Sequence, residues 1–113
     1  MKKLLFLLTL VGILGMQKLS LAITPFSGNG LLDVCNNNKT NCLYYIEGVF
    51  DSALLFEEWA NKCVVSSLPS QITVNQLMDL VLKTIQELPE KRHEPAVLFV
   101  LSTIKYYFPC GKK

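Results

Sequence analysis

The chain has 113 residues, of which 50% are hydrophobic, and its 11 basic and 9 acidic side chains give a formal net charge of +2. A chain of this length supports one small domain, and a charge so close to zero gives no support to a role in nucleic-acid binding. The four cysteines and the single histidine set narrow limits on catalytic and metal-binding chemistry.

The beginning of the chain predicts export. Lys2 and Lys3 precede a mostly apolar run over residues 4–16, and Ser20 and Ala22 supply the small side chains of a cleavage site. This pattern is typical of a secretory signal peptide that ends at Ala22. The apolar run is shorter than the ~20 residues that a membrane-spanning helix needs, so we expect no stable membrane insertion after cleavage.

Cleavage of residues 1–22 would leave one exported domain, residues 23–113. Loss of Lys2, Lys3 and Lys18 lowers the 11 basic residues to 8, against 9 acidic ones, so the net charge of this domain is near −1. A domain of this size buries only about 60–65% of the surface of its unfolded chain and usually benefits from covalent stabilisation. Because the number of cysteines is even and the chain is short and exported, we expect two disulfides.

The helices are predicted from the spacing of apolar residues. A short helix is expected over residues 30–34, followed by a long one that Thr40 or Asn41 can cap and that ends near Lys62. Within the long helix Gly48 costs about 1 kcal/mol relative to alanine, which favours the close approach of another helix there, with simple tolerance of the glycine as the alternative. The apolar face of the long helix comprises Cys42, Tyr45, Ile46, Val49, Ala53, Phe56 and Ala60.

Two further helices follow. Thr73 and Gln76 form a T-x-x-Q capping box at the start of a helix that Pro89 terminates. Pro95 is well placed in the first turn of the last helix, which Pro109 stops. Neither strand-like alternation nor an internal repeat is present, so we expect an all-α, up-and-down bundle of three to five helices. The apolar stripes of these helices comprise Leu77, Leu80, Val81, Thr84 and Leu88, and Val97, Val100, Leu101, Ile104 and Phe108.

The up-and-down arrangement selects one disulfide pairing. It places Cys63, the start of the next helix and Cys110 at one end of the bundle, and Cys35 and Cys42 at the other. A bond between Cys42 and Cys63 would join the two ends of a long helix, about 30 Å apart, although a disulfide needs Cα atoms within ~7 Å. Bonds between Cys35 and Cys63 and between Cys42 and Cys110 would likewise join opposite ends of the bundle. We therefore expect one disulfide between Cys35 and Cys42 and another between Cys63 and Cys110. By closing loops in the unfolded chain, they should stabilise the fold by about 2.5 and 4 kcal/mol, respectively.

The pattern of cysteine and histidine does not indicate metal, redox or nucleophilic chemistry. Successive cysteines are 7, 21 and 47 positions apart, which does not match the close C-x2-C pairs of zinc sites or of thioredoxin-like sites. His93 is the only candidate general base, and it would need a free cysteine thiolate beside it. Because we expect every cysteine to be paired, we expect no cofactor, no metal site and no enzymatic activity.

Two segments are candidates for contact with a partner. The connection that contains Glu90, Lys91, Arg92 and His93 is either a solvated loop or a loop that touches a partner. The helix end "FEEWANK", with the single tryptophan Trp59, is either an acidic, aromatic contact patch or a solvated face with Trp59 half buried. The sequence does not decide between these interpretations.

Several short motifs together suggest a family. They are a C-x2-Y-x2-G-x2-D run of Cys42, Tyr45, Gly48 and Asp51, the helix-opening Thr73 and Gln76, the "RHEPA" segment from Arg92 to Ala96 that contains Pro95, and the terminal Phe108, Pro109 and Cys110. With these motifs the sequence resembles the Rap/Tai family of type VI secretion system immunity proteins. The resemblance covers residues 30–110, so residues 23–113 are expected to form a Rap/Tai-like immunity domain.

The resemblance implies a periplasmic, α-helical, disulfide-bonded protein that is commonly a homodimer. It also implies a partner, a secreted peptidoglycan amidase toxin of the papain-like Cys-His type. A loop or helix of the immunity protein would enter the toxin cleft and occlude its active site, which protects the cell from intoxication by itself or its siblings. A different interpretation from the residues alone is a periplasmic helical chaperone or a carrier of apolar ligands.

One departure from the family pattern concerns the connection after Cys63. Five residues separate Cys63 from Pro69, so this connection is longer than the resemblance leads us to expect. Contacts borrowed from the family are therefore in doubt there, and partner specificity is expected to differ. The candidates for the inserted element are residues 90–93 and residues 64–71, the latter with Ser66 and Ser67.

Overall fold

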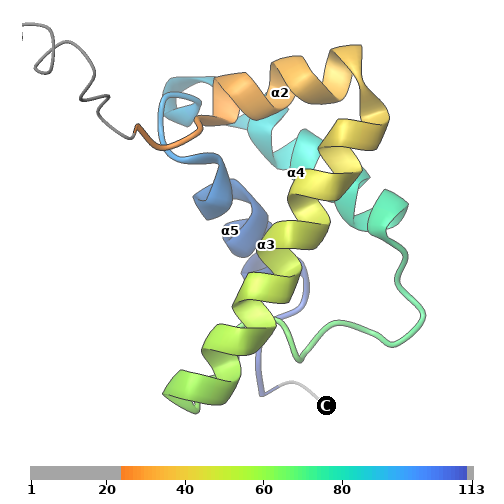
Figure 1. Ribbon diagram of the computed structural model, residues 1–113, viewed down its shortest axis with the longest axis vertical. Helices are drawn as coiled ribbons and strands as arrows, with labels where there is room; N and C mark the ends of the chain where they lie inside the picture. The colour runs from red at the N-terminus through yellow and green to blue at the C-terminus, as the bar shows by residue number, and fades with distance from the viewer. Residues whose placement is uncertain (1–23, 112–113) are drawn as a thin grey trace, which may run out of the picture.

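The structure is a computed structural model that describes residues 24–111 (Figure 1). The described chain forms helices α2 (Gly28–Asn37), α3 (Lys39–Ala60), α4 (Val74–Glu87) and α5 (Ala96–Tyr107), with a short 3-10 helix η1 (Pro89–Lys91). Its one β-type pairing is an isolated bridge between Ser27 and Pro95. The predicted all-α class is therefore confirmed. The predicted signal peptide lies outside the described residues.

The helices surround one apolar core. Helix α2 lies across one end of the molecule and contacts α3, α4 and α5, whereas α3 runs away from it along the length of the fold (Figure 1). The core hydroxyl of Thr103 donates to the carbonyl of Phe99 and lies 2.9 Å from the hydroxyl of Thr84, so its burial leaves no polar atom unpaired. The buried apolar residues are Leu31, Cys35, Cys42, Ile46, Ala53, Val65, Leu77, Met78, Val81, Ile85, Ala96, Phe99, Val100 and Ile104.

One asparagine joins α2 to α3. The backbone N–H of Asn38 donates to the carbonyl of Val34 at 2.7 Å and ends α2. Its side-chain oxygen accepts the N–H of Asn41 at 3.1 Å and begins α3. The prediction that Thr40 or Asn41 caps the long helix is therefore wrong, because α2 continues to Asn37 and leaves Asn38 as the cap that both helices share.

Both predicted disulfides are present. The bond between Cys35 and Cys42 closes the corner between α2 and α3, with Cα atoms 4.7 Å apart, and both residues are buried. The bond between Cys63 and Cys110 has Cα atoms 6.1 Å apart and ties the end of the chain to the residues that follow α3. In contrast to the first pair, both of these cysteines are exposed.

The connection between α3 and α4 corrects one detail of the predicted arrangement. The capping box is as predicted, since Gln76 N–H donates to the hydroxyl of Thr73 at 3.2 Å and Thr73 N–H donates to the side chain of Gln76 at 2.9 Å. The start of α4 does not lie beside Cys63, however. Thr73 shares a pocket with Ile46 and Phe50 of α3, because residues 61–73 run back along α3 before α4 begins (Figure 1).

Gly48 does not lie under another helix. A Cβ atom built on Gly48 meets no atom of the described chain within 4 Å, apart from the backbone of its own helix and its neighbours. The predicted close approach is therefore wrong within this chain. The physical reason is that α5, the helix on that side of α3, is separated from it by a groove whose lining includes Gly48.

Candidate partner-binding surface

Helix α3 extends beyond the core that it helps to form. Its last buried residue is Ala53, although its apolar stripe continues for another two turns. Phe56 is 52% exposed and Trp59 is 79% exposed, so the interpretation of Trp59 as half buried is wrong. Large apolar side chains that are this exposed to solvent on one helix are candidates for a protein interface.

A groove of about 710 Å³ runs between α3 and α5. Tyr45 and Phe56 contribute to it from α3, and Val97 and Leu101, one turn apart, contribute from α5. Gly48 supplies open space rather than a side chain. Since no charged residue lines this groove, it presents an apolar surface that an apolar segment of another molecule can cover.

The groove is fixed near both ends. The ring of Phe26 packs edge to face on Tyr45 with centroids 5.3 Å apart, and the carbonyl of Phe26 accepts the N–H of Ala96 at 2.6 Å. These contacts tie α3 to the start of α5. At the other end, the disulfide between Cys63 and Cys110 ties the residues after α3 to those after α5. The width of the groove is therefore set by covalent and aromatic contacts, which makes the surface preorganised.

A second, smaller pocket of about 290 Å³ lies between α3 and the 61–73 connection. Phe50 and Leu54 of α3 line it together with Leu68 and Ile72 of the connection. Helix α3 therefore separates two apolar hollows, and its exposed face lies between them.

Glu57 holds the first part of the 61–73 connection against α3. Its carboxylate accepts the backbone N–H groups of Val64 and Val65, and that of Ser66 at 2.9 Å. Burial raises the pKa of Glu57, but the hydrogen bonds from Ser66, Val64 and Val65 outweigh it and hold the pKa below its ordinary value. The hydroxyl of Ser67 donates to the carbonyl of Phe108 and adds a second attachment. Ser66 and Ser67 thus lie in an anchored segment beside the end of α3 that carries Trp59.

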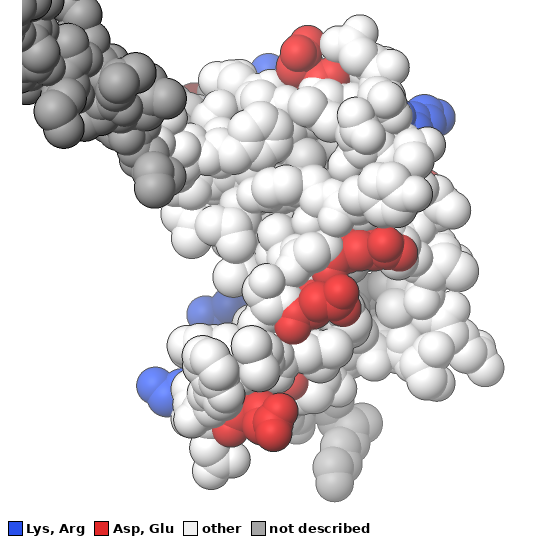
Figure 2. Space-filling view, viewed as in Figure 1, with Lys and Arg blue, Asp and Glu red and all other residues white. Residues whose placement is uncertain are grey.

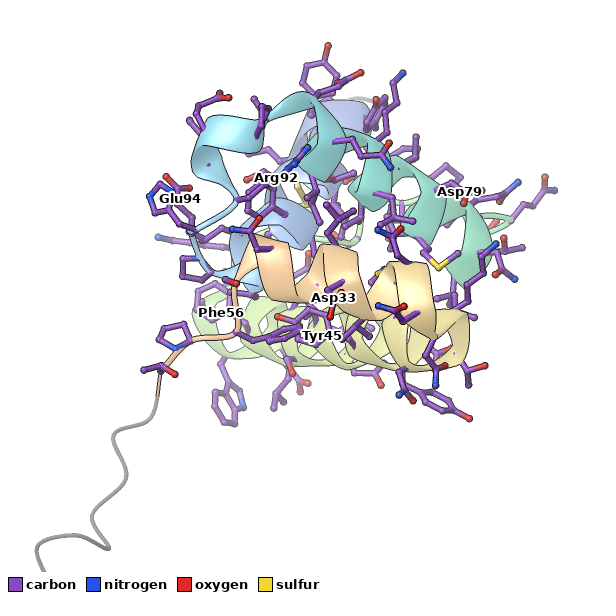
Figure 3. The ribbon with its side chains drawn as sticks, turned by 90° about the horizontal axis from the view of Figure 1, so that it is seen from above. Asp33, Tyr45, Phe56, Asp79, Arg92 and Glu94 are labelled. Carbon is purple, nitrogen blue, oxygen red and sulfur yellow. A yellow bond between two sulfur atoms is a disulfide. The ribbon has the colours of Figure 1, made fainter. Side chains whose placement is uncertain are left out.

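The other predicted contact segment lies at the opposite end of the molecule. Arg92 donates to the carbonyls of Ile85 at 2.9 Å and Gln86 at 3.0 Å, so its side chain caps the end of α4. Its own carbonyl accepts the N–H of Asn29 at 2.8 Å, which docks the loop on the start of α2. Figure 3 shows Arg92 directed toward the helices, while Glu94 lies at the outer edge. Glu90, Lys91 and His93 are exposed.

The structure therefore does not bring the two groups of predicted contact residues together. Trp59, Ser66 and Ser67 lie near the free end of α3, whereas residues 90–93 lie beside α2. His93 lies between Arg92 and Glu94, whose carbonyls accept the N–H groups of Asn29 and Gly28 at the start of α2, whereas the disulfide between Cys35 and Cys42 lies at the other end of this helix.

The described residues also define what chemistry the surface offers. All four cysteines are paired, so no thiolate accompanies His93. Among residues 24–111, no cluster of three or more histidine, cysteine, aspartate or glutamate side chains is arranged to hold a metal ion. No helix in this part of the chain is long and apolar enough to cross a membrane. What the surface does offer is apolar contact area on a fixed scaffold.

Comparison with known proteins assigns this scaffold to a family. A family model described as Rap1a immunity proteins matches residues 27–110, which include all four described α-helices and all four cysteines. The chain belongs to the Rap1a immunity protein family. Neither a search of curated proteins nor a search of solved structures finds a significant match. Family membership makes this an immunity protein and implies a toxin as its binding partner.

In this Rap1a family protein, sequence reasoning missed the α5 side of the groove. The sequence predicts Val97 and Leu101 in the apolar stripe of the last helix, but Val97 is exposed and Leu101 is only partly buried. The buried face consists of Ala96, Phe99, Val100, Thr103 and Ile104, so only Val100 and Ile104 of the predicted stripe belong to it. A signal was present in the sequence, because the run "AVLFVL" is apolar on more sides than one core-facing stripe requires.

Proposed function

We propose that this Rap1a family protein is a periplasmic immunity protein that binds a type VI secreted peptidoglycan amidase and occludes its active site. Such a protein would protect the cell from intoxication by itself or its siblings. The observation that carries the proposal is a scaffold held by two disulfides that exposes a large apolar and aromatic surface. Blocking a cleft requires shape and rigidity but no turnover, and this surface has both.

Two independent features support a periplasmic location. Disulfides form and persist in oxidising compartments, which include the bacterial periplasm. The charged and apolar pattern of residues 1–22 is typical of a secretory signal peptide. Both features support a site of action where a toxin would meet peptidoglycan.

The mechanism that we propose is steric. A papain-like amidase needs its Cys-His cleft open to the stem peptide, so an inserted element excludes the substrate. A stable complex of this kind buries roughly 1,600 Å² and concentrates its binding energy in a few anchors. Trp59 is the strongest anchor candidate, because it is the single tryptophan and is 79% exposed at a free helix end.

Periplasmic co-expression tests this function. Cells that export an amidase toxin are grown with and without this protein, and lysis is followed over time. We expect the protein to prevent lysis by at least one papain-like amidase, chosen first from those encoded beside its gene. If cells are equally sensitive with and without it for every such amidase, the proposed function is wrong.

A carrier of apolar ligands is the second candidate, because the groove of about 710 Å³ exceeds the ~300 Å³ of a small-molecule site. A carrier purified from the periplasm should retain a lipid or another apolar molecule. Extraction into organic solvent followed by mass spectrometry detects such a molecule. If none is found, the carrier function is wrong.

A further inference from the structure

Three exposed carboxylates form a stripe along α3. Glu47, Asp51 and Glu58 are all exposed. At 100° per residue, these positions fall within about 40° of one another around the helix axis. Figure 2 shows acidic side chains along the course of α3, with basic side chains at the left edge of the view beside the lower part of this course. Lys39, at the first position, is the only basic residue of α3, so the exposed face of this helix is acidic.

The acidic stripe lies on α3 between the apolar groove and the second pocket, whose lining includes Glu47. Gly48 follows Glu47 in the chain, which places the open part of the groove about 100° around the helix from the stripe. Along the axis, the groove extends from Tyr44 to Phe56, or about 18 Å at 1.5 Å per residue. Across the groove, α5 contributes a single charged residue, Lys105, one turn beyond Leu101. The surface therefore combines an apolar channel with one acidic edge.

We propose that the α3–α5 groove and the acidic stripe together form the docking surface for the toxin. The proposal rests on the function proposed above and names the chemistry of the partner segment. That segment is apolar, about three helical turns long, and carries lysine or arginine along the edge that faces α3. Its apolar side fills the space over Gly48, and its basic edge pairs with Glu47 and Asp51.

Charge distinguishes this partner from a second copy of the chain. If α3 packed on the α3 of another copy, two acidic helices would lie side by side, and like charges across an interface oppose association. A basic segment gains from the same stripe, both in the rate of encounter and in orientation. Charge complementarity therefore favours a basic partner over the α3 helix of a second copy on this surface.

Two pairs of variants test the docking surface. Gly48→Trp fills the groove from an exposed helix position with free space, and Gln86→Trp adds the same side chain to the exposed face of α4 as its control. The double variant Glu47→Lys/Asp51→Lys reverses the stripe. Asp79→Lys/Glu87→Lys makes the same charge change on α4.

The probe is the amidase identified by the co-expression test, purified with its catalytic cysteine changed to alanine. Its affinity for each variant is measured by calorimetry at low and high salt, after circular dichroism has shown that the variant is folded. We expect Gly48→Trp to weaken binding more than about 30-fold and the stripe reversal to weaken it about tenfold or more, with little remaining salt dependence. Both control variants should stay within about threefold of the wild type.

The outcomes separate this inference from the proposed function. If the wild type neutralises an amidase and both groove variants bind it as tightly as their controls do, the docking surface is wrong and the immunity function stands. If no amidase is neutralised, the proposed function fails and the docking surface fails with it. If the wild type sediments as a dimer and Gly48→Trp as a monomer that still binds the amidase, the groove is occupied by a second copy and the inference is overturned.

Discussion

Glu57 and Ser66 are joined by a hydrogen bond that spans nine positions of the chain, with the backbone N–H of Ser66 donating to the carboxylate at 2.9 Å. The same carboxylate oxygen accepts the N–H groups of Val64 and Val65. One side chain of α3 therefore satisfies three successive backbone donors of the connection that follows. This arrangement gives an irregular segment a fixed position beside the exposed end of α3.

The first prediction concerns this carboxylate. Replacement Glu57→Ala leaves the three N–H groups to water and should lower the free energy of unfolding by about 1 kcal/mol. The neighbouring Glu58→Ala removes the same charge from an exposed position. Urea denaturation of both variants measures the difference. Equal stabilities would show that the hydrogen bonds of Glu57 contribute nothing.

The second prediction is the pH dependence of the same contribution. The pKa of Glu57 in the folded protein lies below its ordinary value of 4.5. A carboxyl group whose folded pKa is lowered stabilises the fold above the unfolded pKa, and this stabilisation is lost as the pH falls through the folded pKa. The difference in unfolding free energy between wild type and Glu57→Gln should therefore shrink from pH 7 to pH 3. A difference that is the same at both pH values contradicts the assignment.

The third prediction concerns the two disulfides, which differ in accessibility. Cys35 and Cys42 are 2% and 0% exposed, whereas Cys63 and Cys110 both lie at the surface. Thiol–disulfide exchange requires attack on a sulfur atom, so access limits its rate. Graded treatment with dithiothreitol should reduce the bond between Cys63 and Cys110 first, as measured by alkylation and peptide mass spectrometry. Faster reduction of the buried bond would mean that the α2–α3 corner opens more readily than the surface bond reacts.

The fourth prediction concerns Gly48. Since its Cβ position is open, Gly48→Ala should stabilise the protein by about 0.5–1 kcal/mol through helix propensity alone. The melting temperature of this domain should rise by roughly 2–8 °C. Alanine is small enough that toxin binding should persist, unlike in the tryptophan variant. A lower melting temperature would show that another surface packs closely on Gly48 under the conditions of the experiment.

Features set by neighbours in sequence could be predicted from the sequence. The capping box of Thr73 and Gln76 depends on residues three positions apart, and the structure has it as predicted. The disulfide pairing followed from helix lengths, because a long helix keeps Cys42 and Cys63 apart. The shared cap at Asn38 was missed, because three successive asparagines precede α3 and each is a good N-cap.

The groove could not be predicted because it depends on distances between helices. An apolar residue such as Val97 fits equally well in a core or beside a groove, and only the position of α5 relative to α3 decides which. The same holds for Gly48. The sequence shows that this position has no side chain, but it does not show whether another helix packs against it. The exposure of Trp59 could not be predicted either. A residue near a helix end is covered only if the connection that follows folds over it, and here that connection binds Glu57 instead.

The fifth prediction separates binding from stability at the end of α3 and rests on the proposed function. Trp59 is 79% exposed, so Trp59→Ala should change the free energy of unfolding by less than about 0.5 kcal/mol. If Trp59 is an anchor, the same variant should weaken toxin binding by about 2 kcal/mol. The reason is that aromatic side chains that become buried under a partner contribute much of the binding energy of many interfaces. Tyr106 is equally exposed, at the end of α5, and Tyr106→Ala is the matched control. Fluorescence of the single tryptophan gives an independent measurement, since burial in the complex should shift its emission to shorter wavelength. Retained toxin affinity in Trp59→Ala, with no spectral shift in the wild-type complex, would place the contact surface away from the end of α3.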